Sequence, residues 1–259
     1  FGRKSMTTEI PLSTSGETAI GVARKAAIKA GSILTDKFLK VNKVSFKGRG
    51  NIVTDVDTEV EFEILSILRN EFPQMKTLGE ESAGASPEKG YVWIVDPLDG
   101  TRNYVSGIPF YSVVIGLACD GEVLVGVNYD PVRQEMFEAE RGNGAFLNGN
   151  LIKISEKTSI ESCVIGMDLS YNNIGAATGL SILQSIWPGM QTARIMGSAA
   201  LGISYAASGR TDLYFHHRLE PWDQVAGILL VNEAGGYVVD RNNQQAHVIS
   251  DGIVAANKE

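Results

Sequence analysis

The sequence predicts a mixed α/β fold that is divided into two lobes. Two helical patterns come first, over residues 17–39 and from Thr54–Thr58 onward, and a group of β-rich runs follows them. Beyond about residue 151, helical and extended patterns alternate, which is typical of a layered α/β unit. We therefore expect residues 1–150 to form an N-terminal lobe, in which two helices cover an antiparallel sheet, and residues 151–259 to form a C-terminal α/β lobe, with a cleft between the two.

The two early helices are predicted by apolar residues that recur every three or four positions. The first pattern consists of Ile20, Ala23, Ala27, Gly31, Leu34 and Phe38. The second pattern consists of Val60, Ile64, Ile67 and Leu68. Thr and Asp precede the second pattern, and both are favoured at helix starts because their side-chain oxygens accept hydrogen bonds from free backbone N–H groups. Such capping explains one of Asp55 and Asp57 but does not require both.

Strands are predicted from short apolar runs that end at turn residues. In the first lobe these runs cover residues 91–95, 111–118, 122–129 and 136–139. Asp120-Gly121 joins two of them and is a strong hairpin signal. The second lobe is predicted to contain a strand at 162–167, a helix at 179–187, an extended segment up to Ile195, a helix at 197–208, a strand at 213–215, a helix at 223–234 and a strand at 236–239.

The composition is that of an ordinary globular enzyme, with 44% hydrophobic and 20% charged residues. The 23 Lys and Arg against 30 Asp and Glu give a net charge of −7, which argues against a nucleic-acid-binding surface. An anionic substrate would need bound cations that reverse the local field. No run approaches the ~18 apolar residues of a membrane span, and no signal-peptide pattern is present. We therefore expect a cytoplasmic protein without membrane or nucleic-acid partners.

The segment Asp96-Pro97-Leu98-Asp99-Gly100 is the centre of the predicted chemistry. It follows the strand expected over residues 91–95, and Pro97 fixes its own φ and favours an extended residue before it. The carboxylates of Asp96 and Asp99 would then converge across a tight turn, and converging carboxylates repel one another unless a cation lies between them. Hard oxygen ligands of this kind suit Mg²⁺, which also takes phosphate oxygens from a substrate. A capped turn without metal is the alternative.

Other candidate residues come from segments before and after this one. Residues 100–103 are typical of the start of a helical turn, whose free N–H groups would hold an anion. Glu80 and Glu81 follow a short apolar run, and a solvated surface pair is the alternative there. Asp223 lies at an expected helix start, where an N-cap role explains it equally well. Residues 216–218, His-His-Arg, place three potentially cationic side chains just before it.

Taken together and in order, these motifs resemble those of the inositol monophosphatase family of Mg²⁺-dependent, lithium-sensitive phosphatases. The motifs are Asp57, Gly79-Glu80-Glu81-Ser82, Asp96-Pro97-Leu98-Asp99-Gly100-Thr101, Trp222-Asp223 and Glu233-Ala234-Gly235-Gly236. The resemblance extends from the first helix to Asn257. It implies an αβαβα sandwich of the inositol monophosphatase and fructose-1,6-bisphosphatase type, with a metal cluster between the lobes, and it implies a homodimer.

The resemblance also implies a role for individual residues. Two to three Mg²⁺ ions would be bound by Glu80, Asp96, Asp99 and Asp223 and by the backbone carbonyl of Leu98. Three residues would act on the attacking water, namely Thr101, Asp57 and Glu81. The substrate would contact Asp99, the backbone amides of Gly100 and Thr101, and the segment Gly197-Ser198-Ala199-Ala200, in particular Gly197 and Ala199. Lys47 aligns with a lysine near the metals, although the loop before Asn51 is one residue shorter here.

One departure from the family pattern affects the choice of substrate. Inositol-specific members carry a glutamate that holds ring hydroxyls, whereas this chain has His216, followed by His217 and Arg218. A cationic rim formed by these residues would favour a substrate with a second anionic group, such as a sugar bisphosphate.

The predicted function is Mg²⁺-dependent hydrolysis of inositol-1-phosphate, or of a related small polyol or sugar phosphate, by direct attack of a metal-activated water. The protein would then be a phosphoric monoester hydrolase of the inositol-phosphate phosphatase type, and it would need no covalent nucleophile. Fructose-1,6-bisphosphatase and histidinol-phosphatase are alternatives on the same scaffold. A nucleotide 3′-phosphatase is disfavoured because residues 214–223 leave little room for a nucleotide-binding insertion. The alternative from another class is a catalytically silent metal- or phosphate-binding regulator.

Overall fold

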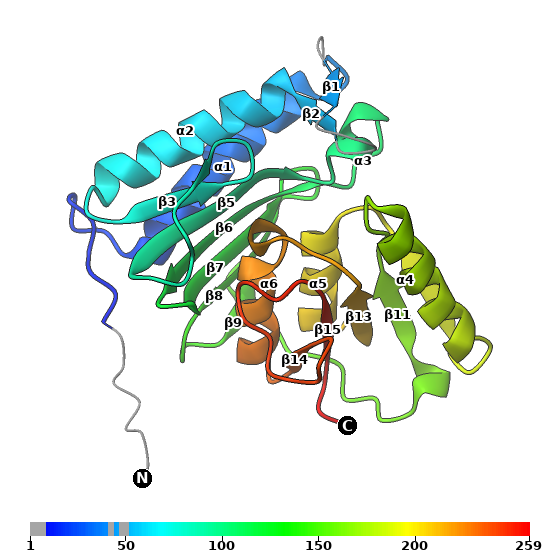
Figure 1. Cartoon of the computed structure of the whole chain (residues 1–259). Coiled ribbons are helices and arrows are strands. Elements are labelled where there is room, and N and C mark those ends of the chain that lie inside the picture. Colours follow the sequence, from blue (N-terminus) through cyan, green and yellow to red (C-terminus); the bar gives the residue numbers. More distant parts are fainter. Residues whose placement is uncertain (1–8, 41–43, 47–51) are drawn as a thin grey trace.

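The computed structural model describes residues 9–40, 44–46 and 52–259, and these residues form five layers (Figure 1). Two helices form the first layer, an eight-stranded sheet the second, two helices the third, a five-stranded sheet the fourth and one helix the fifth. In the same order, the helices are α1 (Ala19–Lys37) and α2 (Asp55–Glu71), then α5 (Ala199–Ala207) and α6 (Pro221–Glu233), then α4 (Asn173–Ile186). The αβαβα sandwich implied by the family resemblance is therefore confirmed.

The first sheet has the strand order β10-β9-β8-β7-β6-β5-β3-β4. Its strands are β3 (Lys76–Gly79), β4 (Ala83–Gly84), β5 (Tyr91–Asp99), β6 (Ser112–Cys119), β7 (Glu122–Asp130), β8 (Glu135–Glu140), β9 (Ala145–Leu147) and β10 (Asn150–Leu151). Neighbouring strands are antiparallel, except that β3 and β5 run parallel. The antiparallel sheet was predicted from the hairpin signals, and the parallel pair was not.

Helices α1 and α2 cover one face of this sheet. They contact it through the apolar residues that recur every three or four positions in the sequence. Ala23, Ala27 and Leu34 of α1 are fully buried, as are Val60 and Ile64 of α2. All five belong to one apolar cluster with side chains of the sheet. Burial of such side chains stabilises the helix in contact with the sheet far more than helix propensity does.

The second sheet has the strand order β12-β11-β13-β15-β14. Its strands are β11 (Val164–Met167), β12 (Thr192–Ile195), β13 (Leu213–His216), β14 (Tyr237–Asp240) and β15 (Ile253–Ala256). β11 is parallel to both of its neighbours, β12 and β13, whereas β15 is antiparallel to β13 and β14. α4 packs on the outer face, and α5 and α6 lie between the two sheets (Figure 1).

Helix α6 lies unusually close to the first sheet because two strand residues opposite it are glycines. A Cβ atom on Gly126 would come within 2.8 Å of the Cα of Ala226, and one on Gly116 within 2.4 Å of a methyl carbon of Val225. Glycine at these positions lets the helix backbone approach the strands. The approach matters for function, because the first turn of α6 carries Asp223.

Four shorter elements complete the list for the described residues. They are the paired strands β1 (Val44–Phe46) and β2 (Ile52–Thr54), the short helix α3 (Thr101–Val105) and the 3₁₀ turn η1 (Ile160–Ser162). α4 begins earlier than predicted, since Gly175 and Gly179 weaken the helical pattern but are buried in the structure. None of the described helices is long and apolar enough to cross a bilayer. The division into two lobes stays a prediction, because α5 and α6 share one apolar cluster with strands of both sheets.

Candidate functional site

A β-bulge in β5 brings Asp96 and Asp99 to the same side of the sheet. The register shifts between the pairs Asp96↔Val114 and Asp99↔Ser112, so that β5 contains one more residue than β6 over this span. Side chains alternate between the faces of a regular strand, and residues three apart would face opposite sides. The extra residue places the side chains of Asp96 and Asp99 on the same side of the sheet. Pro97, which has no N–H group to donate to the ladder, lies inside the bulge. The predicted turn at residues 96–99 is therefore wrong, because β5 continues to Asp99.

The parallel pairing of β3 with β5 brings Glu80 beside Asp96. Gly79 is the register partner of Val95, and the N–H of Glu80 donates to the carbonyl of Val95 at 3.2 Å. The next residues along the two strands are Glu80 and Asp96, whose side chains share a hydrogen bond. Both carboxylates thus lie directly after the stretch over which β3 and β5 pair in parallel.

Asp223 reaches the same point from the first turn of α6. One carboxylate oxygen from each of Asp96, Asp99 and Asp223 lies within 4.8 Å of the other two. Asp223 is the third residue of the helix, and one of its oxygens accepts a hydrogen bond from the N–H of Glu220 at 2.7 Å. The N-cap residue is Glu220, so the N-cap role considered for Asp223 is wrong.

The pKa values of these carboxylates are strongly raised. Asp96 and Asp99 are 1% and 7% exposed. Burial raises the pKa of Asp96 well above its usual value, and the negative charges of Glu80, Asp99 and Asp223 raise it further. Loss of hydration and neighbouring acids likewise raise the pKa of Asp223. Ionised together, these groups repel one another, and a divalent cation would relieve that repulsion.

The donor set fits Mg²⁺. It consists of carboxylates and, by the family resemblance, the carbonyl of Leu98, all of which are hard oxygen ligands. Leu98 lines the same pocket as the acids, and its N–H donates to Asp96 at 2.9 Å, which keeps that carboxylate in place. Assignment of the individual ligands stays a prediction.

Thr101 and Asp57 form a hydrogen-bonded pair next to these acids. The Thr101 hydroxyl lies 3.3 Å from a carboxylate oxygen of Asp57 and 2.9 Å from the carbonyl oxygen of Leu98. Asp57 is the third residue of α2, and its other oxygen accepts hydrogen bonds from the N–H and hydroxyl of Thr54, the N-cap residue. Burial raises the pKa of Asp57. The pair could orient a water and accept its proton.

Asp99 joins the acidic cluster to the start of α5. It accepts hydrogen bonds from the hydroxyl of Ser198 and from the N–H groups of Ala199 and Ala200, the latter two at 3.3 and 3.1 Å. Burial raises the pKa of Asp99 to about 7, and the hydrogen bond from Ser198 lowers it in part. The segment expected to meet the substrate is thus attached directly to a predicted metal ligand.

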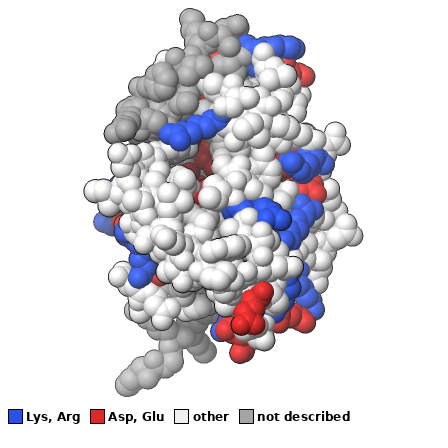
Figure 2. Space-filling model, turned by 90° about the vertical axis from the view of Figure 1, so that its right-hand side faces the viewer, with Lys and Arg blue, Asp and Glu red and all other residues white. Residues whose placement is uncertain are grey.

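These residues line one pocket of about 1030 Å³. Figure 2 shows acidic side chains at the bottom of a hollow in this face, with Lys and Arg side chains nearby. The predicted site residues among its lining are Glu80, Asp96, Leu98, Asp99, Gly100, Thr101, Gly197, Ala199, His216 and Asp223. Gly100 adopts a φ of 90°, and a Cβ atom there would lie 3.2 Å from the carbonyl oxygen of Gly197, so the backbones of these two segments approach closely at this point.

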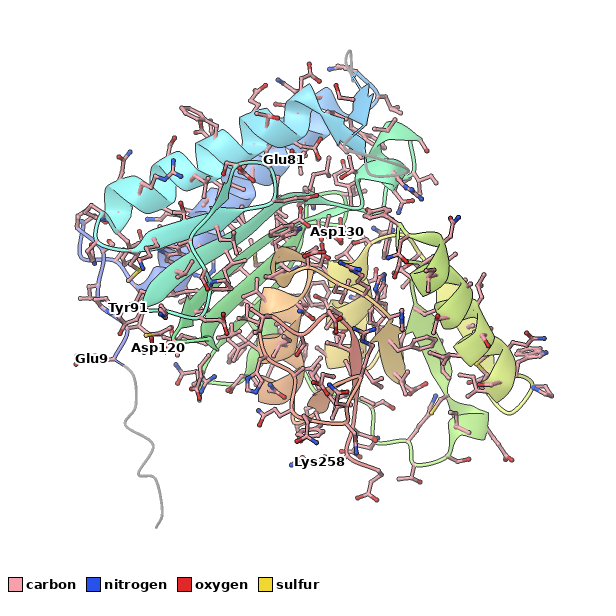
Figure 3. All side chains as sticks on the ribbon, in the orientation of Figure 1. Glu9, Glu81, Tyr91, Asp120, Asp130 and Lys258 are labelled. Carbon is pink, nitrogen blue, oxygen red and sulfur yellow. The ribbon has the colours of Figure 1, made fainter. Side chains whose placement is uncertain are left out.

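Two predicted residues do not line the pocket among the residues described, and one cannot be placed. Glu81 lies in the turn between β3 and β4, close to α2 (Figure 3), and its N–H donates to Glu61 at 2.8 Å. Asp57 does not line the pocket itself but is hydrogen-bonded to Thr101, which does. Lys47 lies outside the described residues.

His216 belongs to the pocket wall but is not a cation. It is 6% exposed, and burial lowers its pKa to about 4. Its Nδ1 accepts a hydrogen bond from the N–H of Arg218 at 3.2 Å, so the neutral ring carries its hydrogen on Nε2. The cationic rim expected from residues 216–218 is therefore wrong at its first member, because a buried imidazole loses the hydration that stabilises its charged form.

This lowered pKa predicts an acid-sensitive fold. As the pH falls from about 6.5 to about 4, His216 takes up a proton in the unfolded chain but not in the folded one, so stability falls with pH. We expect His216→Gln to reduce the stability lost between pH 7.5 and 4.5 by ~2–3 kcal/mol, measured by urea unfolding. His247→Gln, at an exposed histidine, is the matched control. Equal pH dependence in wild type and His216→Gln would contradict the prediction.

Sequence reasoning missed two buried acids near the site. Glu61 of α2 is 2% exposed and lies under Gly79, where a Cβ atom would come within 2.5 Å of its carboxylate. Asp168 follows β11, is 6% exposed and lines the pocket. Glu61 falls on the buried face of the helical pattern, where a charged residue is unusual. This position is the feature of the sequence from which Glu61 could have been identified.

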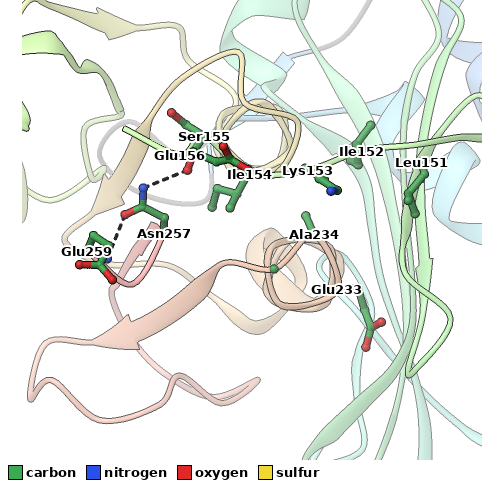
Figure 4. Close-up of a pocket in the computed structure, with 11 residues that line it drawn as sticks. Leu151, Ile152, Lys153, Ile154, Ser155, Glu156, Glu233, Ala234, Asn257 and Glu259 are labelled. Atoms are coloured by element: carbon green, nitrogen blue, oxygen red, sulfur yellow. Dashed lines mark hydrogen bonds between the residues drawn. The ribbon is translucent and has the colours of Figure 1, made fainter. Parts of the chain in front are cut away.

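A second pocket, of about 470 Å³, lies at the end of α6 (Figure 4). It is lined by residues 151–156 and 233–235 and by two residues of the C-terminal segment, Asn257 and Glu259. Asn257 donates to the carbonyl of Ser155 at 2.9 Å. None of the described acids that cluster at the first pocket lies here, so the first pocket is the candidate active site.

Comparison with known proteins agrees with this assignment of the site. A model of the inositol monophosphatase family matches residues 16–259. Inositol monophosphatase 3 of Solanum lycopersicum is 36% identical, over 93% of this chain and 92% of the relative. A fructose-1,6-bisphosphatase/inositol-1-monophosphatase of Thermotoga maritima is 37% identical, over 88% of this chain and 87% of the relative.

Two further relatives carry the name SuhB. The Nus factor SuhB of Escherichia coli is 35% identical, over 92% of this chain and 91% of the relative. The crystal structure of the extragenic suppressor protein suhB of Bartonella henselae matches with a TM-score of 0.87 and 37% identity, over 92% of this chain and 93% of that one. A family model and relatives of this identity, covering nearly the whole chain, leave one conclusion: the protein belongs to the inositol monophosphatase family.

Proposed function

We propose that this protein is a Mg²⁺-dependent phosphatase that hydrolyses inositol-1-phosphate or a related small polyol or sugar phosphate. The observation that carries the proposal is the convergence of Glu80, Asp96, Asp99 and Asp223 in one pocket, beside the Thr101–Asp57 pair. Bound Mg²⁺ would supply Lewis acidity at the phosphate and lower the pKa of a bound water. No other described group of acids outside this pocket brings three ligand atoms so close together.

The chain's own residues would bind the phosphate and direct the water. Gly100 is the N-cap residue of α3 and Thr101 its first residue, and their backbone N–H groups would hold the phosphate there. The Thr101 hydroxyl would orient the water toward phosphorus, and the Asp57 carboxylate would hold that hydroxyl and take up the proton. Positioning and charge stabilisation account for most of the rate in such reactions.

A wall of the same pocket would select the leaving group. Gly197, Ala199 and His216 line it. His216, as a neutral ring with its hydrogen on Nε2, would donate one hydrogen bond to a substrate hydroxyl rather than attract a second phosphate. This favours a polyol monophosphate over the sugar bisphosphate considered from the sequence.

A regulatory role is the second candidate, since several relatives are named Nus factor SuhB. Such a protein need not catalyse anything. Retention of all four acids and of the Thr101–Asp57 pair in one pocket favours the enzyme, because a silent relative has no mechanistic need for the whole set. Two or three bound Mg²⁺ ions, lithium inhibition, a homodimer and a cytoplasmic location accompany the family assignment as further predictions.

We expect phosphate release to require Mg²⁺ and to depend on the leaving group. The panel is inositol-1-phosphate, fructose-1,6-bisphosphate, histidinol phosphate and adenosine 3′,5′-bisphosphate, each with Mg²⁺ and with EDTA. Removal of Mg²⁺ should lower the rate by at least ~10³-fold, because charge stabilisation at the phosphate is lost. The highest kcat/KM is expected for the inositol ester. The absence of Mg²⁺-dependent turnover on every ester, including p-nitrophenyl phosphate, would favour the regulator.

A further inference from the structure

Asp168 lies where the connections of the second sheet diverge. From β11 the chain passes through α4 to β12 on one side, and from β12 it passes through α5 to β13 on the other side of β11. α4 and α5 cover opposite faces of the sheet (Figure 1). In such sheets the crevice outside the carboxyl ends of the strands, at the point where the connections diverge, is the usual binding place. Asp168 is the first residue after β11 and lines this crevice.

Both carboxylate oxygens of Asp168 accept hydrogen bonds from neighbouring groups. One oxygen accepts hydrogen bonds from the N–H groups of Met196 and Gly197, at 2.9 and 2.5 Å. The other accepts a hydrogen bond from the hydroxyl of Tyr214 at 3.0 Å. The side chain is almost fully buried. Hydrogen bonds to a buried carboxylate are among the stronger ones in proteins, so this contact fixes the backbone at residues 196–197.

The same backbone is also held by Asn103 of α3. Its amide group donates to the carbonyl of Met196 at 2.7 Å and to that of Phe110 at 2.9 Å. Gly197 adopts a φ of 82°, and a Cβ atom there would come within 2.9 Å of the Asn103 side chain. The peptide between Met196 and Gly197 is thus clamped between Asp168 and Asn103.

The clamped peptide leads directly into the residues that hold Asp99. Ser198, Ala199 and Ala200 follow it and donate hydrogen bonds to the Asp99 carboxylate. A shift of the Met196–Gly197 peptide would therefore move both Gly197 and Ala199 in the pocket wall and the donors that orient Asp99.

We infer that Asp168 is a positioning residue. It sets the place of the Gly197–Ala199 wall, which selects the leaving group, and it sets the orientation of Asp99 through the start of α5. The inference rests on the proposed function, because it assigns a residue to the substrate side of the same site. It adds a residue whose hydrogen bonds go to Met196, Gly197 and Tyr214.

A purely structural role is the alternative, and Asp212 provides the control. Asp212 is also a buried acid of the second sheet, lying just before β13, and it accepts hydrogen bonds from the N–H of Val164 at 2.6 Å, from Ser155 and from Lys157. It does not line the active-site pocket among the described residues. Asp212→Ala therefore removes a comparable anchor from the same sheet without touching the wall.

The experiment compares Asp168→Ala, Asp168→Asn, Asp168→Glu and Asp212→Ala in the full chain. KM and kcat are measured with Mg²⁺ for inositol-1-phosphate and for p-nitrophenyl phosphate, whose leaving group has no hydroxyls to place. Mn²⁺ affinity is measured by electron paramagnetic resonance, and melting temperature by circular dichroism.

For Asp168→Ala we expect KM for inositol-1-phosphate to rise ~10-fold while KM for the aryl ester changes less than ~2-fold, since only the hydroxyl-bearing leaving group needs the wall. Mn²⁺ affinity should fall ~3–10-fold through Asp99. Asp168→Asn keeps an oxygen acceptor for both backbone N–H groups and should restore most of both properties. Asp168→Glu should fold and raise the same KM by ~5-fold, because its extra methylene displaces the clamped peptide.

The inference is overturned if folded Asp168→Ala or Asp168→Glu resembles Asp212→Ala, with a lower melting temperature but an unchanged KM ratio and Mn²⁺ affinity. Asp168→Glu decides alone if Asp168→Ala does not fold. If the wild type hydrolyses neither ester, the proposed function fails by itself. The positioning role is then judged on Mn²⁺ affinity, which must fall in the Asp168 variants and stay unchanged in Asp212→Ala.

Discussion

Asp96→Asn is expected to abolish phosphate release and, in the absence of metal, to make the protein more stable. Asp96 is nearly inaccessible to solvent and lies among Glu80, Asp99 and Asp223. An amide binds Mg²⁺ far more weakly than a carboxylate, so kcat/KM should fall at least ~10³-fold. Removal of one charge from the cluster relieves repulsion in the metal-free protein, and a gain of ~1 kcal/mol would raise its melting temperature by ~2–4 °C.

The two effects are measured on the same samples. Phosphate release is followed with Mg²⁺, and thermal unfolding is followed at pH 7.5 with EDTA and again with Mg²⁺, where the wild type should gain the larger stabilisation. Asp130→Asn is the matched control, since Asp130 is a fully buried acid of the same sheet whose carboxylate is hydrogen-bonded to Val132 and Arg133 instead. A metal-free Asp96→Asn protein that melts below the wild type would show that the acids are not in mutual repulsion.

Thr101→Val is expected to lower kcat by ~10²–10³-fold with little change in KM, because it removes the hydroxyl that would orient the attacking water. Valine has nearly the same shape, so packing at this buried position is kept. The hydroxyl also contacts Asp57 and the carbonyl of Leu98, and its loss leaves the Asp57 oxygen with one hydrogen bond fewer.

Thr101→Ser is the matched control for this change. It keeps the hydroxyl and loses one methyl group, so kcat should stay within ~5-fold of the wild type and stability should fall by about 1 kcal/mol. Steady-state kinetics on the best substrate of the panel decide the outcome. Equal activity of the Val and Ser variants would exclude Thr101 from the chemistry and leave it a capping and packing residue.

The helices, the hairpins and the set of acids could be predicted from the sequence because each rests on local chemistry. The apolar periodicity placed α1 within two residues of its observed ends, and Asp120-Gly121 joins β6 to β7 as expected. The acids Glu80, Asp96, Asp99 and Asp223 were selected because each follows or begins an apolar element, and the structure brings them together.

The geometry that unites these acids could not be predicted, because it depends on pairing between distant segments. The β5 bulge exists only relative to the register of β6, and Glu80 meets Asp96 only because β3 pairs parallel with β5. Asp168 left no signal, since an acid after a short strand is common and its partner Gly197 lies on another strand connection. The charge of His216 was predicted wrongly for the same reason, as burial is set by the whole fold.

The dispersal of the acids along the chain has a consequence for the folding reaction. Glu80 and Asp96 belong to the first sheet, whereas Asp223 belongs to a helix that is added after most of the chain has been made. The predicted ion site would thus form only when the middle layer docks on the first sheet, a contact of high sequence separation that is expected late in folding. Bound metal would therefore stabilise the folded protein and slow its unfolding, but it would have no binding site through which to guide the early folding steps, in contrast to a zinc finger.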